Sequence, residues 1–402
     1  MFFRALWHIR KSLALTLSAM AFLALLSSCT YSEGVESGDT DLSCTVSDTV
    51  FLSHSGVSVS AASAVLMDAS SGLIIASVSP DERRPMASTT KIMTAIVALE
   101  CCDIQKKIKV SKDAVGIEGS SVYLYAEEEL TLEDLLYALL LESANDAAAA
   151  IAIDIGGSIE GFANLMNEKA EALGLKNTHF TNPHGLDDDG HYTTARELAT
   201  ITRYALENED FARIASTYKK TIPLNGGEGE RLLINHNKLL RSYDGIIGVK
   251  TGYTKKSGRC LVSAAEKDGM RLICVTLSAP DDWNDHQSLL DYGFSSYSSR
   301  LLCSKGEIEE IVPVVGGNAE YVIATNKSAL KLTLPQSASV ECRLELPSFE
   351  YAPVSEGDRI GTAVFFAEGE EIARMPLYAN FSVGEANHKR LFFEWFISLF
   401  NK

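Results

Sequence analysis

The order of apolar and polar positions predicts a domain whose first and last segments are strands. Two apolar runs, 63–68 and 73–76, flank a Ser-Ser-Gly turn and predict a hairpin. Later runs of the same short, apolar kind occur at 245–250, 260–265 and 271–277. An Asp-Gly turn at 268–269 would pair Lys267 with Met270. We therefore expect one antiparallel sheet that is built from both ends of a domain.

The middle of this domain has the pattern of helices. Residues 88–99 begin at Ser88, a residue type that caps helices, and continue as an almost wholly apolar run. Such a helix should be buried on all sides. Thr131, followed three positions later by Asp134, predicts a capping box for a leucine-rich helix. Two more helices are predicted at 146–155 and 159–173.

Beyond residue 294 the pattern changes to short strands separated by turn residues. The runs are 311–315, 321–323, 330–334, 359–364 and 373–377. They predict a small β-sandwich domain over 299–385, after a larger domain over 56–298. The predicted fold class is α+β, with an antiparallel sheet flanked by a helical cluster, then the small all-β domain and a C-terminal amphipathic helix.

The N-terminus has the character of an export signal. Basic residues precede an apolar run at 13–26, which is too short to span a bilayer. The run ends in Leu-Ser-Ser-Cys, which resembles the lipobox of bacterial lipoproteins, with Cys29 as the lipid attachment site. We expect a signal peptide with lipobox over 1–29, and ordinary signal cleavage near the same place is the alternative. Residues 30–55 have a polar, acidic composition that predicts a disordered tether.

Residues 386–402 predict an amphipathic membrane-interface helix. On a helix Arg390, Glu394 and Ser398 form part of a narrow polar stripe, and aromatic and aliphatic residues cover the rest. About ten apolar residues rise only ~15 Å, half of a bilayer core, so the segment is too short to span a membrane. The alternative is a terminal helix that docks on the β domain.

Composition narrows the classes of function. The chain has 402 residues, of which 46% are hydrophobic and 22% charged, so it can bury a real core. Its formal net charge of −17 argues against a nucleic-acid partner, which needs a basic surface. The cysteines lack metal-site spacing. Cys260 and Cys274 fall on opposite faces of the predicted hairpin and should not be bonded, whereas a disulfide between Cys303 and Cys342 stays open.

Three short motifs carry the candidate chemistry. Ser88 and Lys91 lie three residues apart at the start of the buried helix, so their side chains share one face. A serine needs an adjacent base to act as a nucleophile, and a lysine can be that base when its charged form is destabilised. Ser-Ala-Asn at 143–145 falls in a predicted loop between two helices, and Lys-Thr-Gly at 250–252 ends a predicted strand.

In this order and on these elements, the motifs resemble those of the penicillin-recognising serine acyl-transferase superfamily. More narrowly, the chain resembles the low-molecular-weight penicillin-binding proteins that act as D-alanyl-D-alanine carboxypeptidases. The further matching segments are 86–94, 182–186, 191–195 and 235–240. The resemblance implies a β-lactamase/transpeptidase-like domain that acts on the peptidoglycan stem pentapeptide and is inhibited by β-lactam antibiotics.

The resemblance also implies catalytic roles. Ser88 would attack the carbonyl between the two terminal D-alanines, and Lys91 would accept its proton. Ser143 would relay that proton to the leaving amine, while Asn145 holds Lys91 and the substrate amide. Lys250 would keep Lys91 neutral through its positive charge.

The implied substrate-binding residues lie on and near the predicted strand. They are Lys250, Thr251, Gly252, Tyr253 and His236. Thr251 with Lys250 would hold the terminal carboxylate, and the N–H groups of Ser88 and Tyr253 would form the oxyanion hole. Many relatives have an arginine where His236 stands and another basic residue in the segment 281–286. Carboxylate recognition is therefore left to Thr251 and Lys250, or to protonated His236.

Two other functions share part of this pattern. A class A β-lactamase has all three motifs, but it is usually a single domain and needs a glutamate that no matching motif supplies. The other is a non-catalytic cell-surface sensor of penicillin or peptidoglycan. Such a sensor does not require the catalytic residues, so the intact motifs favour the enzyme. Endopeptidase action on cross-links is not separable by sequence.

We predict no metal and no cofactor, because the four histidines near the motifs show no metal-ligand spacing. The expected location is the cell envelope, on the outer face of the cytoplasmic membrane. The C-terminal helix and an N-terminal lipid would hold the chain there.

Overall fold

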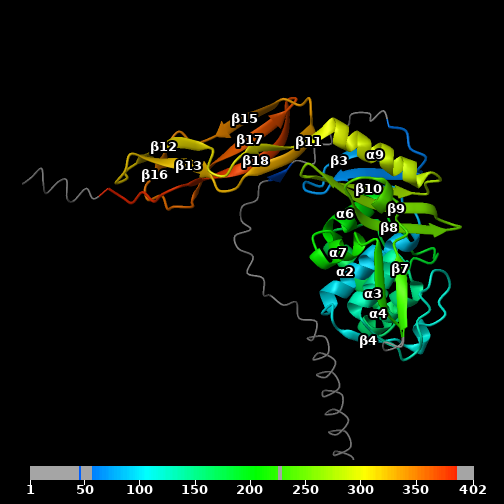
Figure 1. The fold of residues 1–402 in the computed structure, drawn as a ribbon. Coiled ribbons are helices and arrows are strands. Elements are labelled where there is room, and N and C mark those ends of the chain that lie inside the picture. The colour runs from blue at the N-terminus through cyan, green and yellow to red at the C-terminus, as the bar shows by residue number, and fades with distance from the viewer. Residues whose placement is uncertain (1–44, 47–56, 225–228, 387–402) are drawn as a thin grey trace, which may run out of the picture. The chain divides into compact units, whose positions relative to one another are not determined.

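The computed structural model describes residues 45–46, 57–224 and 229–386. A five-stranded antiparallel sheet forms the centre of the larger domain (Figure 1). Its strands, in spatial order, are β3 (Ile74–Val78), β2 (Ser63–Asp68), β10 (Met270–Leu277), β9 (Gly258–Lys267) and β8 (Ile246–Thr254). Lys267 pairs with Met270 across the β9–β10 turn. The predictions of the sheet and of this register are confirmed.

Alternate residues of the sheet pack on opposite layers, as the period of a strand requires. On one face Val65, Val262 and Ile273 join the core of the helical cluster. On the other face Leu66 and Cys274 pack in a separate core with Leu289 and Leu290, which belong to α9 (Asp282–Ser296). The sheet is therefore covered on both faces.

The helical cluster is formed by the middle of the domain. Its helices are α2 (Lys91–Cys101), α3 (Leu132–Leu141), α4 (Asn145–Gly156), α5 (Ile159–Ala172), α6 (Ala195–Ala205), α7 (Glu209–Ala215) and the short α8 (Leu239–Ser242). Two hairpins accompany them, β4 (Lys107–Lys109) with β5 (Glu129–Thr131) and β6 (Lys219–Leu224) with β7 (Gly229–Ile234). As predicted, α2 is buried from Lys91 to Ala98 and Thr131 forms a capping box with Asp134.

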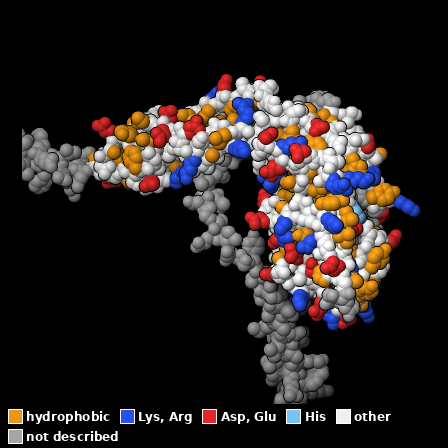
Figure 2. Space-filling view, viewed as in Figure 1, with side chains coloured by type: hydrophobic (Ala, Val, Ile, Leu, Met, Phe, Trp, Pro, Cys, Tyr) orange, Lys and Arg blue, Asp and Glu red, His pale blue; other side chains and the backbone are white. Residues whose placement is uncertain are grey.

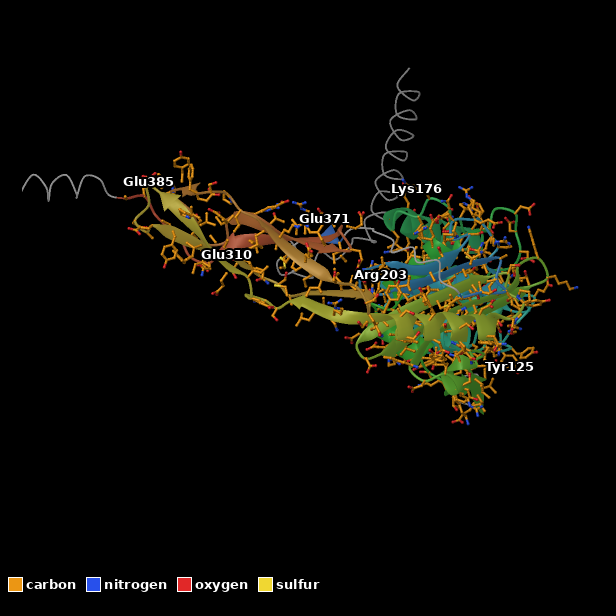
Figure 3. The ribbon with its side chains drawn as sticks, turned by 90° about the horizontal axis from the view of Figure 1, so that it is seen from above. Tyr125, Lys176, Arg203, Glu310, Glu371 and Glu385 are labelled. Carbon is orange, nitrogen blue, oxygen red and sulfur yellow. The ribbon has the colours of Figure 1, made fainter. Side chains whose placement is uncertain are left out.

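The turn between β2 and β3 is fixed by polar contacts. Asp68, which is fully buried, accepts hydrogen bonds from the hydroxyls of Ser70 and Ser71. Arg203 of α6, labelled in Figure 3, donates to the carbonyl oxygens of Ala69 and Ser70 at 2.7 and 3.0 Å. These bonds join the first hairpin to the helical cluster.

Three local features differ from the sequence predictions. Ser88 does not cap the buried helix, because it lies inside a 3-10 turn, η1 (Ala87–Thr90), that precedes α2. Asn145 is the first residue of α4 and not part of the preceding loop. The Lys-Thr-Gly motif lies within β8, which continues to Thr254 because residues 251–254 pair with 258–261 of β9.

The small domain is all-β, as predicted. Its larger sheet has the order β15 (Val340–Glu345), β17 (Arg359–Ala367), β18 (Glu370–Ala379), β13 (Tyr321–Asn326), β12 (Glu309–Val315) and β16 (Glu350–Tyr351). A second, two-stranded sheet joins β11 (Tyr297–Cys303) to β14 (Leu330–Pro335). Cys303 and Cys342 are free cysteines, and so are Cys260 and Cys274.

The predicted tether over 30–55 needs a correction at one point. Thr45 and Val46 form β1, which pairs with Arg374 and Ala373 of β18. Threonine and valine are β-branched, and such residues add readily to the edge of a strand.

Two other predictions lie outside the described residues. They are the signal peptide over 1–29, with Cys29, and all but the first residue of the helix predicted over 386–402.

In the part of the chain that the structure describes, no helix is long and apolar enough to cross a membrane. On the face shown in Figure 2, acidic and basic side chains are intermixed over both domains.

Candidate active site

Ser88 and Lys91 meet where η1 joins α2. Ser88 is half-buried, whereas the side chain of Lys91 is completely buried. Lys91 Nζ lies 3.0 Å from Ser88 Oγ, 2.7 Å from Asn145 Oδ1 and 2.6 Å from the carbonyl oxygen of His184. The spacing of one helical turn therefore brings the serine and the lysine into hydrogen-bond contact.

The surroundings of Lys91 favour its neutral form. Burial lowers the pKa of Lys91 well below its usual value, the charge of Lys250 lowers it further, and Asp146 opposes both effects. A neutral amine has two N–H groups and one lone pair. Asn145 Oδ1 and His184 O can accept the two N–H groups, which leaves the lone pair for the hydroxyl of Ser88. This arrangement can remove the proton of Ser88.

The carbonyl of His184 is held by a turn that sequence reasoning did not connect with Lys91. Asn182 Oδ1 accepts hydrogen bonds from His184 N and Gly185 N, and Asn182 Nδ2 donates to Leu186 O. Gly185 has φ +87°, and a Cβ there would lie 1.9 Å from Ala87 O. Only glycine fits this position. The Asn-Pro-His-Gly run at 182–185 is the sequence signal that could have predicted the turn.

Ser143 and Asn145 come from the connection between α3 and α4. Ser143 has φ +59° and is nearly buried. Asn145 N donates to Ser120 O, and Asn145 Nδ2 donates to Glu118 O. The neighbouring carboxylate of Asp146 accepts from Ser121 Oγ, Val122 N and Leu124 N. The loop around Ser120 is thus fixed to the start of α4.

Strand β8 runs beside Ser88. A Cβ at Gly252 would lie 3.0 Å from Ser88 N and 3.2 Å from Met86 O, so the backbones approach closely only because this residue is glycine. Lys250 is buried, which lowers its pKa to about 7, while Glu142 acts in the opposite direction. Its Nζ donates to Thr251 O at 2.9 Å.

A cleft of about 340 Å³ opens over these residues. It is lined by Ser88, Ser120, Ser143, His236, Lys238, Thr251, Gly252, Tyr253, Arg259, Asp282 and Trp283. The structure therefore brings the predicted motif residues to one place, with Lys91 and Asn145 buried against Ser88. No sequence motif marks Lys238, Arg259 or Trp283 as residues of the cleft.

The histidines have separate environments. His236 lines the cleft and its Nε2 lies 3.1 Å from Glu142 Oε2. His286 is fully buried between Ser263 Oγ and Thr276 Oγ1, and burial lowers its pKa to about 3. It is a core residue and does not reach the cleft. Among the described side chains, no group of three or more His, Cys, Asp or Glu is placed to hold a metal ion.

Comparison with known families agrees with this geometry. The family model described as D-alanyl-D-alanine carboxypeptidase matches residues 50–281, which is more than half of the chain. The chain belongs to the D-alanyl-D-alanine carboxypeptidase family. As a member of this family it is a serine hydrolase, and the resemblance inferred from the sequence is confirmed. A second model, the C-terminal domain of penicillin-binding protein 5, matches residues 297–385.

Curated members of the carboxypeptidase family align over most of the chain. D-alanyl-D-alanine carboxypeptidase DacF of Bacillus subtilis is 33% identical over 350 residues, which cover 83% of this chain and 90% of DacF. D-alanyl-D-alanine carboxypeptidase DacA of Escherichia coli is 31% identical and aligns with 84% of this chain and 89% of its own.

Solved structures extend the family relationship to the fold. Penicillin-binding protein 5 of Haemophilus influenzae superposes with a TM-score of 0.72 at 30% identity, over 82% of this chain and 99% of that chain. The Streptomyces K15 DD-transpeptidase gives a TM-score of 0.56 at 32% identity, over 60% of this chain and 98% of its own. The predicted α+β fold is confirmed by these neighbours.

Proposed function

We propose that this protein is a serine-type D-alanyl-D-alanine carboxypeptidase that removes the terminal D-alanine from peptidoglycan stem peptides through an acyl-enzyme on Ser88. One observation carries the proposal. The buried Lys91 amine lies 3.0 Å from Ser88 Oγ, and its two other partners are oxygen acceptors. The relatives that are named D-alanyl-D-alanine carboxypeptidases support the choice of substrate.

The first step forms the acyl-enzyme. Ser88 Oγ attacks the carbonyl carbon between the two terminal D-alanines while its proton moves to Lys91 Nζ. The N–H groups of Ser88 and Tyr253 donate to the oxygen that becomes negative. The approach of β8 to Ser88 at Gly252 supports this pairing, because it places the two backbone segments side by side.

The second step releases D-alanine. The proton on Lys91 passes to Ser143 Oγ and from there to the departing amine nitrogen as the C–N bond breaks. Asn145 holds Lys91 through Oδ1 during this transfer. A water molecule then attacks the ester carbon, and its proton passes through Lys91 Nζ to Ser88 Oγ as the ester C–O bond breaks. Ser88 is restored, and the stem peptide leaves one D-alanine shorter.

The same serine accounts for inhibition by β-lactams. Attack of Ser88 on the β-lactam carbonyl opens the ring and leaves a stable ester. Relatives that carry the name penicillin-binding protein support this expectation.

Two assays test the proposal. The purified protein should release free D-alanine from a stem pentapeptide, and labelled penicillin should become covalently attached. Ser88→Ala should abolish both activities. Ser158→Ala is the matched control, because Ser158 also stands at a helix start, where it caps α5, and does not line the cleft. Label on the Ser88→Ala protein, or no release of D-alanine by the wild type, would contradict the proposal.

We also propose that the protein works outside the cytoplasm, attached to the membrane at both ends of the chain. The basic residues and apolar run ahead of Cys29 support export and lipidation. The aromatic and aliphatic residues that surround the polar stripe at 391–400 support an interfacial helix. One lipid and one amphipathic helix are each weak anchors, but two such signals together give stable attachment.

A further inference from the structure

The register of β8 and β9 places the cationic side chain of Arg259, which has no role in the proposed mechanism, beside Thr251. Tyr253 pairs with Arg259 and Thr251 pairs with Leu261, so the side chains of Thr251 and Arg259 lie on the same face of the sheet. They are diagonal neighbours, at a separation that a long side chain can bridge. Both residues line the cleft that contains Ser88.

Arg259 is oriented by a buried carboxylate. Asp282 Oδ1 accepts from Arg259 Nε at 2.9 Å and from Nη2 at 2.8 Å. The Asp282 side chain is only 4% exposed, whereas that of Arg259 is 41% exposed. Arg259 Nη1 makes no hydrogen bond to any residue in the described ranges, so part of the guanidinium is available to a ligand.

The neighbouring groups make this end of the cleft positive. Trp283 lies close to two cations, with Lys238 Nζ 5.9 Å and the Arg259 guanidinium carbon 5.7 Å from its ring centre. The acidic group that lines the cleft, Asp282, is nearly buried and paired with Arg259. The other candidates for an anion site are less suitable, because His236 contacts Glu142 and Lys250 is buried and donates to Thr251 O.

We propose that Arg259, together with Thr251, binds the free carboxylate of the departing D-alanine. This inference rests on the proposed function. A guanidinium matches the planar geometry of a carboxylate with two parallel hydrogen bonds, and Asp282 holds it ready to make them. Arg259 is then the residue by which the enzyme selects peptides with a free C-terminus, and Asp282 is its positioning residue.

The test compares two substrates that share the scissile bond, an acyl-D-alanyl-D-alanine peptide and its C-terminal amide. Wild-type enzyme should prefer the free acid. Arg259→Gln should lower kcat/KM for the acid by roughly 10- to 100-fold, the worth of hydrogen bonds between charged groups, and should change kcat/KM for the amide little. Arg259→Lys keeps the positive charge but lacks the planar group that donates two parallel hydrogen bonds, so it should retain part of the preference for the free acid.

Arg271→Gln is the matched control. Arg271 also lies in the central sheet, pairs with a carboxylate, Glu266, and is 42% exposed, but it does not line the cleft. Its variant should keep the wild-type preference. Thermal unfolding and circular dichroism, neither of which depends on a carboxylate ligand, check that every variant is folded.

Three results would overturn the inference. Equal losses on both substrates would mean that Arg259 shapes the cleft without contacting the carboxylate. An unchanged preference in Arg259→Gln would mean that it is not used. A selective loss in Lys238→Gln alone would assign the carboxylate to the other cation beside Trp283. A wild-type enzyme that hydrolyses neither substrate would instead refute the proposed function, on which this inference depends.

Discussion

At the scale of single residues, Lys91 and Lys250 have the same chemistry and different surroundings. Both are buried, but only Lys91 lies on the helical turn that carries Ser88. Burial removes water from an ammonium group, and each unit by which a pKa falls corresponds to about 1.4 kcal/mol in favour of the neutral amine. Lys91 is thereby suited to accept the proton of Ser88. Lys250 supplies the positive charge that lowers the pKa of Lys91 further.

Substitution by arginine should separate these two roles. Lys91→Arg should lower the rate of acylation by labelled penicillin by roughly 10²- to 10⁴-fold, because a guanidinium does not act as a base at ordinary pH. Lys250→Arg keeps a positive charge and should retain measurable acylation. Equal and complete loss in both variants would refute this division.

The pH dependence of acylation should show the same division. Deprotonation of Lys91, whose pKa is lowered by burial and Lys250, lets the rate rise with pH at the acidic end. Lys250 has a pKa of about 7, so its charge is lost as the pH rises through neutrality, and the rate should then fall. The Lys250→Arg variant should not show that fall, since the guanidinium stays protonated. The same alkaline fall in both proteins would assign it to another group.

At the scale of elements, the site depends on how closely strand β8 passes η1. Gly252 permits this approach, because a methyl group there would lie 3.0 Å from Ser88 N and 3.1 Å from Ala87 Cβ. These neighbours are backbone atoms and a short side chain, which have little freedom to move. The distance between strand and turn is therefore sensitive to a single carbon atom.

Gly252→Ala should displace β8 from Ser88 and lower the acylation rate by roughly 100-fold, the effect of a shift of about 1 Å at a reacting centre. The melting temperature should change much less than the rate. Gly384→Ala is the control, because a Cβ there meets nothing nearer than the Asn318 side chain at 3.4 Å. A Gly252→Ala enzyme with wild-type acylation would show that the cleft tolerates the added group.

The sequence predicts these elements better than it predicts their contacts. Apolar runs and an Asp-Gly turn were sufficient for the hairpin register at Lys267 and Met270, and Thr131 with Asp134 was sufficient for the start of α3. Local patterns carry no information about η1 or about the approach of Gly252 to Ser88, because both depend on packing between segments far apart in the chain.

Contacts between distant segments also explain why the sequence does not mark some residues of the cleft. Arg259 reads as an ordinary polar residue of a strand until the pairing of β8 with β9 places it on the face of Thr251. The carbonyl of His184 is a backbone group, and no residue type marks it. His286 also lies close to the motifs in the sequence, but it is a buried core residue that contacts Ser263 and Thr276.

At the scale of the whole molecule, the proposed anchors at the two ends act independently of the cleft. We expect metabolic labelling with a fatty acid to tag the wild-type protein, and Cys29→Ala to lose the tag, because the lipid bond forms on the cysteine sulfur. The described residues Cys101 and Cys342 are exposed and make suitable control substitutions. Labelling that persists in Cys29→Ala would place the lipid elsewhere.

Truncation after Asn387 tests the other anchor. The unlipidated, shortened protein should bind liposomes more weakly, because it lacks the aromatic residues expected to enter the interface. Hydrolysis of a soluble peptide should be unchanged. Loss of soluble activity, or liposome binding equal to that of the full chain, would identify the segment as a structural element.

The pairing of β1 with β18 would set the length of chain between the proposed lipid on Cys29 and the folded protein. From Cys29 to Thr45 the extended chain reaches about 55 Å, whereas a chain free as far as residue 57 would reach about 95 Å. The two-residue strand would thus shorten the chain between lipid and protein by some 40 Å, and that chain would end at the small all-β domain. A lipid on Cys29 would therefore limit how far β18 can rise above the membrane, and with it the depth of cell wall from which the enzyme can draw its stem peptides.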